Sequence, residues 1–499
     1  LGVGSVRGLV KCLGSLVLGF CDSGNWESIR EGFEALVKFS LDKRPKVRRS
    51  GQECVEKVFK SFGSSSVRME ASKLVLSLVE SCKLEAIKLS ELSVEDGSKE
   101  VSLSRPEHLE VLYILHLVKI VVPCLTTEIS LKILSQLVGL MHSEFSVLTR
   151  HLFKVIEAFL EASEDKVIGC HIEKIVSCLC SYVSAKEKNP VDTVVSALIL
   201  LRLACPKLPA RGLTKIIAHV CSSVVGVLTC DGIASTASET MSELVKNFLD
   251  ENINLNGASQ SSPSVSVESE EKELVRSICV VLEKSLSSCK GIPNKYLLRT
   301  ISAMFQKLRG SADTYMRSIS LKLGELRKSA NPDAPGTTDL DCCIGSAVVA
   351  MGPEWILSLF PISTHADDCS TTNFWLIPIL KNYVVGAPLG YYIEHIVPLA
   401  KSLLRAGRKV KKSSVGEELQ AHAHDLLQLL CSFCRFPNDT AKRFESLAEL
   451  LINFLKKDLL SPQYVAIALQ SLVKQNSQIL ESGEKAAELI GGSVKDSDF

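Results

Sequence analysis

Residues 41–55, LDKRPKVRRSGQECV, decide the fold of this chain. Asp42 and a short turn come first, and Pro45 removes a backbone donor, so the preceding helix cannot continue through it. From Val47 onward, apolar residues recur at the 3.6-residue spacing of a helix. The stretch therefore predicts a junction between two helices and, with it, the boundary of a helical repeat.

Amphipathic runs of this kind follow one another along almost the whole sequence. Beyond the first junction we expect helices at residues 70–92, 107–124, 128–142, 146–162, 167–183, 191–205, 213–228, 235–249, 272–288, 295–307 and 315–328. A pair of such runs occupies about 40 residues, which is the period of HEAT and armadillo repeats. We therefore predict an all-α fold, a HEAT- or armadillo-like α-solenoid of antiparallel helix pairs.

Changes in composition divide this predicted solenoid into five segments. Helical repeats are expected at residues 1–251, 272–330 and 340–499, the last with an irregular Gly-Pro-Glu segment. Residues 252–271 are rich in Ser, Asn and Glu and carry too little apolar surface to offset the entropy of ordering them, so they predict a flexible loop. Residues 331–339 contain Pro and Gly and predict a linker.

Composition and charge narrow the class of partner. Hydrophobic residues make up 46% of the chain but aromatic residues only 6%, as expected where aliphatic side chains pack helix against helix. The formal net charge is +1, so any electrostatic partner must bind a local patch. The apolar stretch at residues 111–125 is too short to span a bilayer, so we predict no membrane contact. The 18 cysteines lie scattered on helical faces and predict reduced thiols in the cytosol or nucleus.

Two basic clusters are the candidate binding sites. They are predicted to lie at turns between helices, which line an edge of a solenoid where phosphates or an acidic partner could bind. Arg48 is expected to be structural, because in such repeats an Arg after Val commonly pairs with a nearby acid. The candidate RNA or acidic-partner contacts are Lys43, Arg44, Lys46 and Arg49 in the first cluster, and Arg405, Arg408, Lys409, Lys411 and Lys412 in the second.

The sequence contains no motif that indicates a catalytic or metal site. There is no Gly-rich phosphate loop, no H-E-x-x-H and no G-x-S-x-G, so we predict no enzyme, no cofactor and no small-molecule substrate. His422, His424, Cys431 and Cys434 have zinc-ligand chemistry. They fall in one predicted helix that points the two histidines to different faces, so we predict core cysteines and surface histidines without a metal.

A resemblance to a known family comes from two blocks of sequence. Residues 350–362, AMGPEWILSLFPI, and residues 373–380, NFWLIPIL, resemble the ribosomal RNA-processing protein 12 family, and residues 42–48 are similar to it as well. The resemblance implies a HEAT-repeat factor of the nucleus and nucleolus in small-subunit ribosome biogenesis. It would act in precursor rRNA processing and preribosome export by binding preribosomal RNA and ribosome assembly proteins. Members of the family are longer, so the chain would correspond to an N-terminal-to-middle portion, and no catalytic residues carry over.

One alternative function shares the predicted fold. A nuclear transport adaptor of the importin or exportin type would also be an α-solenoid, but it would bind a small GTPase or nucleoporins. Nucleotide-dependent GTPase binding separates the two hypotheses. The Gly-Pro-Glu block itself has a structural explanation, because Gly352 and Pro353 break one helix and Trp355 begins the buried face of a short one.

Overall fold

The computed structural model describes residues 2–490 apart from residues 23, 96–105, 143, 163–164, 210–212, 250–264, 365–370 and 410–413. The chain divides into two compact units, and the division falls inside helix α12 (Val265–Ser288). The first unit comprises residues 1–248 and 264–278, and the second takes up the chain again at Cys279.

The first unit is built entirely of helices in its described part. They are α1 (Val3–Phe20), α2 (Trp26–Ser40), α3 (Pro45–Ser61), α4 (Ser65–Glu95), α5 (Pro106–Val121), η1 (Val122–Cys124), α6 (Thr127–Val138), α7 (Thr149–Ala162), α8 (Asp165–Ser184), α9 (Val191–Ala204), η2 (Cys205–Lys207), α10 (Leu213–Val225), α11 (Ala234–Phe248) and the start of α12. Nearly every run expected from periodicity is a helix whose ends differ from the prediction by only a few residues.

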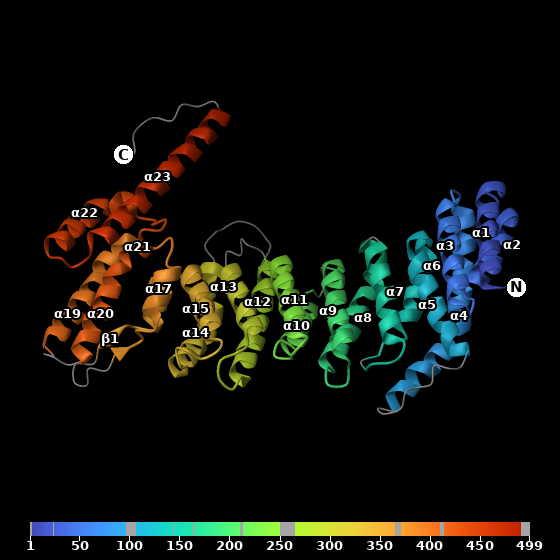
Figure 1. Ribbon diagram of the computed structural model, residues 1–499, viewed down its shortest axis with the longest axis horizontal. Helices are drawn as coiled ribbons and strands as arrows, with labels where there is room; N and C mark the ends of the chain where they lie inside the picture. The colour runs from blue at the N-terminus through green and yellow to red at the C-terminus, as the bar shows by residue number, and fades with distance from the viewer. Residues whose placement is uncertain are drawn as a thin grey trace. The chain divides into compact units, whose positions relative to one another are not determined.

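These helices stack in two rows. The odd-numbered helices α1, α3, α5, α7, α9 and α11 contact one another in succession, and α2, α4, α6, α8 and α10 do the same (Figure 1). Helices that follow each other along the chain, such as α2 and α3 or α8 and α9, pack across the two rows. This two-row stack of antiparallel pairs is an α-solenoid, as predicted.

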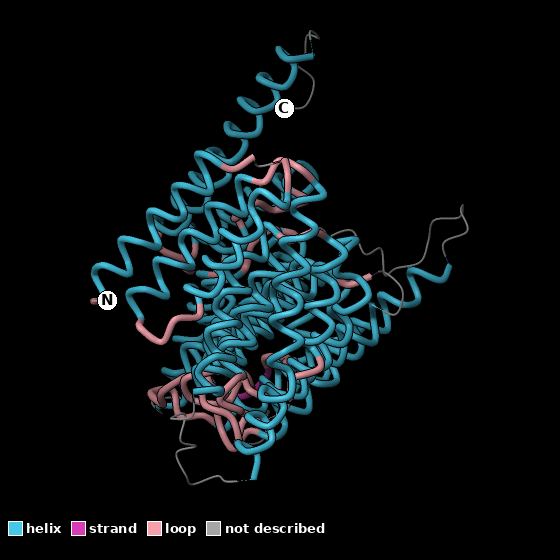
Figure 2. The backbone as a smooth tube through the Cα atoms, turned by 90° about the vertical axis from the view of Figure 1, so that its right-hand side faces the viewer, coloured by secondary structure: helices cyan, strands magenta, loops and turns pink. Residues whose placement is uncertain are grey.

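The second unit continues the helical architecture with shorter elements. It holds the end of α12, α13 (Lys295–Leu308), η3 (Arg309–Ser311), α14 (Ala312–Ser329), α15 (Thr337–Met351), α16 (Pro353–Leu359), β1 (Ser363–Thr364), β2 (Thr371–Thr372), α17 (Leu376–Tyr383), α18 (Leu389–Tyr391), the π-helical η4 (Tyr392–Ile396), α19 (Val397–Lys409), α20 (Ser414–Gln428), α21 (Leu430–Phe433), α22 (Thr440–Lys456) and α23 (Pro462–Ile490). The strands β1 and β2 form a two-residue antiparallel pair, visible as a small magenta segment among the helices (Figure 2). Helices α13, α15, α17, α21 and α23 contact in succession and form one row.

The junction between α2 and α3 packs around an aromatic cluster. Phe33 of α2 is fully buried, and its ring centroid lies 5.6 Å from that of Phe59 and 5.5 Å from that of Phe62, both in edge-on or steeply inclined geometry. Trp26 closes the cluster at 6.2 Å from Phe33. Each such ring pair stabilises the fold by about 0.5–1.5 kcal/mol beyond the burial of the rings. The cluster therefore holds α2 and α3 together beside the turn that joins them.

Two predicted segment boundaries are wrong. Helix α12 begins at Val265, so the last seven residues of the predicted loop 252–271 are helical, and residues 252–264 lie outside the described residues. Helix α15 begins at Thr337, so the predicted linker 331–339 ends three residues early. In both places a helix extends N-terminally into polar residues for which the sequence predicts a break.

The Gly-Pro-Glu segment is a tight junction between two helices. Gly352 has φ of +83°, a conformation that favours glycine, and Pro353 occupies the first position of α16. Helices α15 and α16 are bent by 120° at this point. Trp355 donates a hydrogen bond from Nε1 to Asp313 Oδ1 at 2.5 Å, which ties α16 to α14. The segment thus serves packing within the second unit.

The described cysteines are all free thiols, and several behave as small core residues. Cys180 and Cys221 are buried in the first unit, and burial raises the pKa of each thiol to about 12. Thiols with so high a pKa are protonated and poorly nucleophilic at neutral pH.

One described helix, α1, is long and apolar enough to cross a membrane by length and composition alone, and the bent pair α15–α16 would be a second if taken as one span. Helix α1 is a longer apolar run than residues 111–125, on which the prediction of no spanning segment rested. Its Val6, Val10 and Val17 are buried, and it contacts α2 and α3 in the helical stack.

Candidate nucleic-acid interface

Part of the first basic cluster is used to build the α2–α3 turn. Arg44 forms a bidentate ion pair with the Asp42 carboxylate, donating from Nε to Oδ1 at 2.9 Å and from Nη2 to Oδ2 at 2.7 Å. The hydrogen bonds from Arg44 hold the pKa of the Asp42 carboxyl below its ordinary value. Asp42 also accepts the backbone N–H of Arg44 at 2.8 Å. Arg44, a predicted contact, therefore has its charge matched within the turn.

Arg48 fixes the turn to the next odd-numbered helix. Its Nη1 donates to the backbone carbonyls of Asp42 at 2.8 Å and Lys43 at 3.3 Å. Its guanidinium carbon lies 3.8 Å from the ring centroid of Tyr113 on α5, a cation–π contact. Arg48 is structural, as expected, but through main-chain carbonyls and an aromatic ring.

The other three predicted contacts of this cluster reach solvent. Lys43, Lys46 and Arg49 are exposed, and none of them forms an ion pair within the described part of the chain. Lys46 and Arg49 lie one turn apart on α3 and therefore share one face of the helix. The buried side of α3 carries Val47 and Ser50, so the two cations lie on the solvent side.

The stacking of α3, α5 and α7 brings further basic side chains beside this cluster that lie far from it in the sequence. His116 and Lys119 on α5 and Lys154 on α7 are exposed, and His151 on α7 is half-buried. Partial burial lowers the pKa of His116, and the positive charges of Lys119, Arg48, Lys154 and Arg49 lower it further. Side chains from three helices, far apart in sequence, therefore share one electrostatic environment.

His151 shows the same effect from the α7 side. Burial lowers its pKa first, followed by the charges of Lys154, His116 and Arg150. The signal that could have found this group is the repeat itself. Solvent-facing positions of consecutive odd-numbered helices lie beside one another, although the residues at these positions are far apart along the chain.

Farther along the same row, the cations are neutralised by acids. Arg150 pairs with Asp192 of α9 at 2.7 Å. Arg202 of α9 pairs with Glu243 of α11 and, at 3.7 Å, with Glu239. These pairs tie neighbouring helices together and leave little net charge on the α9–α11 surface. Arg49 on α3, Lys119 on α5 and Lys154 on α7 form no ion pair in the described part of the row, and neither do Arg7 and Lys11 on α1.

The second predicted cluster lies in the other unit. Arg405, Arg408 and Lys409 are exposed at the end of α19, where cations also favour the helix C-terminus, and they form no ion pair in the described residues. Lys411 and Lys412 lie outside the described residues. Lys401 is exposed one turn before Arg405, so the basic stripe on α19 begins earlier than predicted.

The candidate zinc ligands have separate partners. The ring of His422 stacks on Phe374 with a centroid distance of 4.2 Å, and the thiol of Cys431 donates to the Tyr464 carbonyl at 3.4 Å. Cys434 is buried, and burial raises its pKa to about 12. Among the described residues, no three His, Cys, Asp or Glu side chains come together in an arrangement that could hold a metal.

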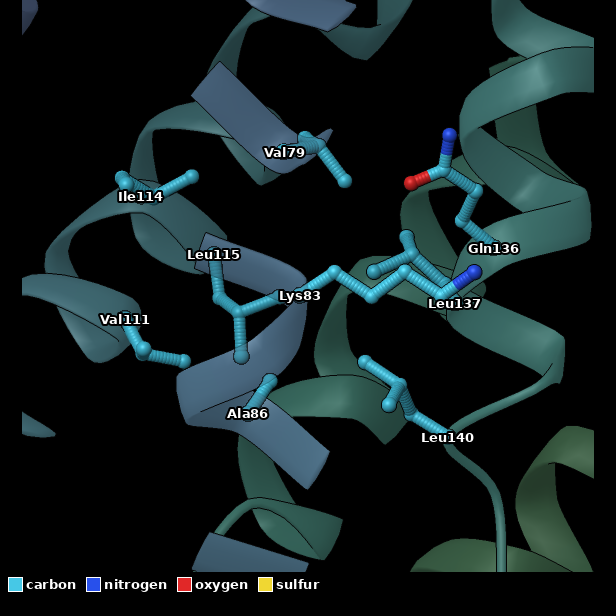
Figure 3. Close-up of a pocket in the computed structure, with 9 residues that line it drawn as sticks. All are labelled: Val79, Lys83, Ala86, Val111, Ile114, Leu115, Gln136, Leu137 and Leu140. Atoms are coloured by element: carbon cyan, nitrogen blue, oxygen red, sulfur yellow. The ribbon is translucent and has the colours of Figure 1, made fainter. Parts of the chain in front are cut away.

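A small cavity lies between α4, α5 and α6 (Figure 3). Its volume is about 10 Å³, and apolar side chains such as Val79, Leu115 and Leu137 line it. Figure 3 shows the Lys83 side chain crossing it toward Leu137. A space of this size holds about one water molecule and does not admit a small-molecule substrate.

The fold defines the class: an α-solenoid of HEAT-type helical repeats, here with exposed cations on one face of its first unit. Two family models match, "RRP12-like, N-terminal HEAT repeats" over residues 1–167 and "Ribosomal RNA-processing protein 12, HEAT repeats" over residues 230–497. The chain belongs to the RRP12 family.

Curated relatives agree with this assignment. The RRP12-like protein of Gallus gallus is 24% identical over 90% of this chain, and that of Homo sapiens is 23% identical over 84% of it. Ribosomal RNA-processing protein 12 of Saccharomyces cerevisiae is 22% identical over 97% of the chain. The chain spans about a third of the length of the first two relatives, 34% and 32%, and 41% of the yeast protein.

Two of the solved structures that resemble this chain are similar to it at a low level. The match to a crystal structure of importin beta covers 94% of this chain and 54% of the importin beta chain, at 12% identity and a TM-score of 0.37. The structure of Kap121p bound to Nup53p covers 96% and 53%, at 13% identity and a TM-score of 0.32. At these TM-scores the likeness says nothing about what this chain binds.

Proposed function

We propose that this chain is a non-enzymatic scaffold in the assembly of the small ribosomal subunit, and that it binds preribosomal RNA and assembly proteins during precursor rRNA processing and preribosome export. The observation that carries the proposal is membership of the RRP12 family, whose models match both units. A relative named for ribosomal RNA processing matches nearly the whole chain. The nucleus, and the nucleolus within it, is the compartment this role requires.

The exposed cations supply the chemistry of RNA contact. We assign it to Lys43, Lys46 and Arg49 in the first unit and, in the second, to the cluster of Arg405, Arg408, Lys409, Lys411 and Lys412. Arg44 is left out because its charge is matched by Asp42. Cations on a solenoid surface bind phosphates without reading sequence, so the contacts position the scaffold and do not select a base.

The test is depletion and rescue of the full-length protein in cells. Depletion is expected to increase precursors of small-subunit rRNA on a Northern blot, and re-expression to restore them. The tagged protein is expected to sediment with particles that contain this precursor. Unchanged precursors together with sedimentation only as free protein would contradict the proposal.

The transport-adaptor alternative is separated by a pull-down with a nuclear small GTPase loaded with GDP or GTP. A scaffold is expected to bind neither form selectively. Retention of the GTP form alone would favour an adaptor over the scaffold.

A further inference from the structure

The solvent face of α3, α5 and α7 carries positive charge from three successive repeats. Its cations are Arg49 on α3, Lys119 on α5 and Lys154 on α7, and the exposed His116 on α5, whose lowered pKa keeps it mainly neutral at neutral pH, adds a hydrogen-bonding group among them. Helices α3 and α5 are in contact, as are α5 and α7, and the three lie side by side in the first unit (Figure 1). Packed helices are roughly 8–10 Å apart, so this face presents a cation on each of three parallel ridges.

Contacts beneath this face hold the three helices in place, so the spacing between its cations is fixed. Arg48 lies on the Tyr113 ring at 3.8 Å and locks α3 to α5. On α7, Phe153 is buried and packs edge-on to Tyr182 of α8 with a centroid distance of 5.2 Å. Little ordering is therefore required when a partner binds, which favours affinity from weak individual contacts.

We propose that this face, centred on Arg49, His116, Lys119 and Lys154, binds the sugar-phosphate backbone of double-helical RNA. The inference rests on the proposed function and names the RNA feature and helices it would use. It extends the predicted α3 cluster across two further repeats, to residues that no sequence motif marked.

The absence of apolar anchors argues for RNA over an acidic protein. Stable protein interfaces centre on buried aromatic or aliphatic anchors, whereas nucleic-acid interfaces are more polar and far more positively charged. In the described part of the chain, large hydrophobic side chains are exposed on α1, α9 and α22, for example Leu16, Ile199 and Ile452, but none lies on α3, α5 or α7. This face offers charge alone.

The same face favours double-helical over single-stranded RNA. Single strands bind by stacking their bases on exposed aromatic side chains. Of the aromatic residues on the described parts of these helices, Phe59, Phe153 and Phe159 are buried, and Tyr113 is covered by Arg48. With no Phe, Tyr or Trp platform, the available contacts are to phosphates and 2′-hydroxyls, which is how A-form helices are recognised.

Acidic groups near the face set its limits. Glu53 lies one turn beyond Arg49 on α3, and Glu157 lies one turn beyond Lys154 on α7. Neither carboxylate forms an ion pair with these cations in the described residues. The bound phosphates are therefore expected at the N-terminal halves of α3 and α7, on the side of the α2–α3 turn.

The test measures, by fluorescence anisotropy, how tightly the 499-residue chain binds a 20-base-pair RNA duplex of arbitrary sequence. The titration is repeated over a range of salt concentrations. The variant carries Arg49→Gln, Lys119→Gln and Lys154→Gln. The matched control removes three exposed cations from the even-numbered row, with Lys38→Gln, Lys174→Gln and Lys215→Gln on α2, α8 and α10. Circular dichroism and thermal unfolding check that both fold like the parent.

Each lost phosphate contact weakens binding roughly fivefold at 0.15 M salt, so the first variant is expected to bind about 100-fold more weakly, with a salt slope reduced by about three. The control is expected to bind like the parent. Equal losses in both variants, or equal affinity for a single strand of the same length, would overturn the proposal.

Failure of this inference and failure of the proposed function give different results. If the Gln variant of the full-length protein still sediments with precursor particles and rescues processing, the scaffold role stands and this face does not carry it. If those particles hold the protein equally well after RNase treatment, an acidic protein partner replaces RNA at this face and the inference is overturned. Loss of rescue in the variant alone supports both.

Discussion

Arg48 and Arg49 are adjacent in sequence, yet the structure gives them different tasks, and Arg48→Ala tests this division. Arg48 donates to two main-chain carbonyls, at 2.8 and 3.3 Å, and lies over Tyr113 at 3.8 Å. A hydrogen bond to a charged group contributes about 1.5–3 kcal/mol, and a partly exposed cation–π contact about 1 kcal/mol. The substitution is therefore expected to destabilise the α2–α3 turn and its contact with α5 by about 3 kcal/mol together.

The assay is hydrogen exchange followed by mass spectrometry, because a stack of repeats opens locally and need not unfold in one step. A loss of about 3 kcal/mol corresponds to roughly 100-fold faster exchange for amides that exchange through this opening. Peptides from α3 and α5 are expected to show it, while peptides from α9 and α10 serve as internal references. Arg48→Lys should recover only part of the protection, since lysine lacks the planar group that covers the ring.

The matched control is Arg49→Ala, which removes an exposed cation from the next position. It is expected to leave exchange unchanged and to weaken RNA binding. If Arg48→Ala leaves exchange in α3 and α5 as it is in the parent, or if Arg49→Ala accelerates it as much, the division of tasks derived from the geometry is wrong.

Three further predictions concern stability. Gly324→Ala places a methyl group against the ring of buried Phe360, inside van der Waals contact, and is expected to lower the free energy of unfolding by about 1–3 kcal/mol in a urea titration; a midpoint equal to the parent's would refute this. Asn294→Ala removes the cap that accepts two backbone amides at 3.0 and 3.1 Å and is expected to cost about 1 kcal/mol, while Asn294→Ser should restore most of it; equal stability of Ala and Ser would refute the cap. The pKa values of His116 and His151 are lowered in the folded chain, so the unfolded chain binds protons more readily. The free energy of unfolding should therefore fall as the pH drops from about 7 through the unfolded-state pKa near 6.5 and on through the lower folded-state pKa values. A double His→Gln variant with the same pH profile as the parent would refute this.

Most of the fold could be predicted from periodicity because each repeat buries the same apolar stripe. Val47, Val55 and Phe59 repeat at helical spacing, and all three are buried on α3. Prolines marked helix starts well, as at Pro462, where α23 begins. Periodicity failed where a helix extends into polar residues, as at Val265 in α12, since those turns carry no apolar stripe to detect.

The candidate interface was only partly predictable. A search for neighbouring cations found Lys46 and Arg49 but also Arg44, whose charge is used inside the turn. It could not find Lys119 or Lys154, because only the stacking of repeats brings them beside Arg49. The spacing between the contributing positions depends on loop lengths that vary from repeat to repeat, so no fixed interval in the sequence marks them.

Ultraviolet crosslinking in nuclear extract, with identification of the crosslinked peptides, tests whether the full-length protein contacts preribosomal RNA through this solenoid. We expect crosslinks to precursor rRNA on peptides from α3, α5 and α7 that are lost when Arg49, Lys119 and Lys154 are changed to Gln. Crosslinks confined to the even-numbered helices, or none on this chain in particles that contain it, would show that these helices do not bind the RNA.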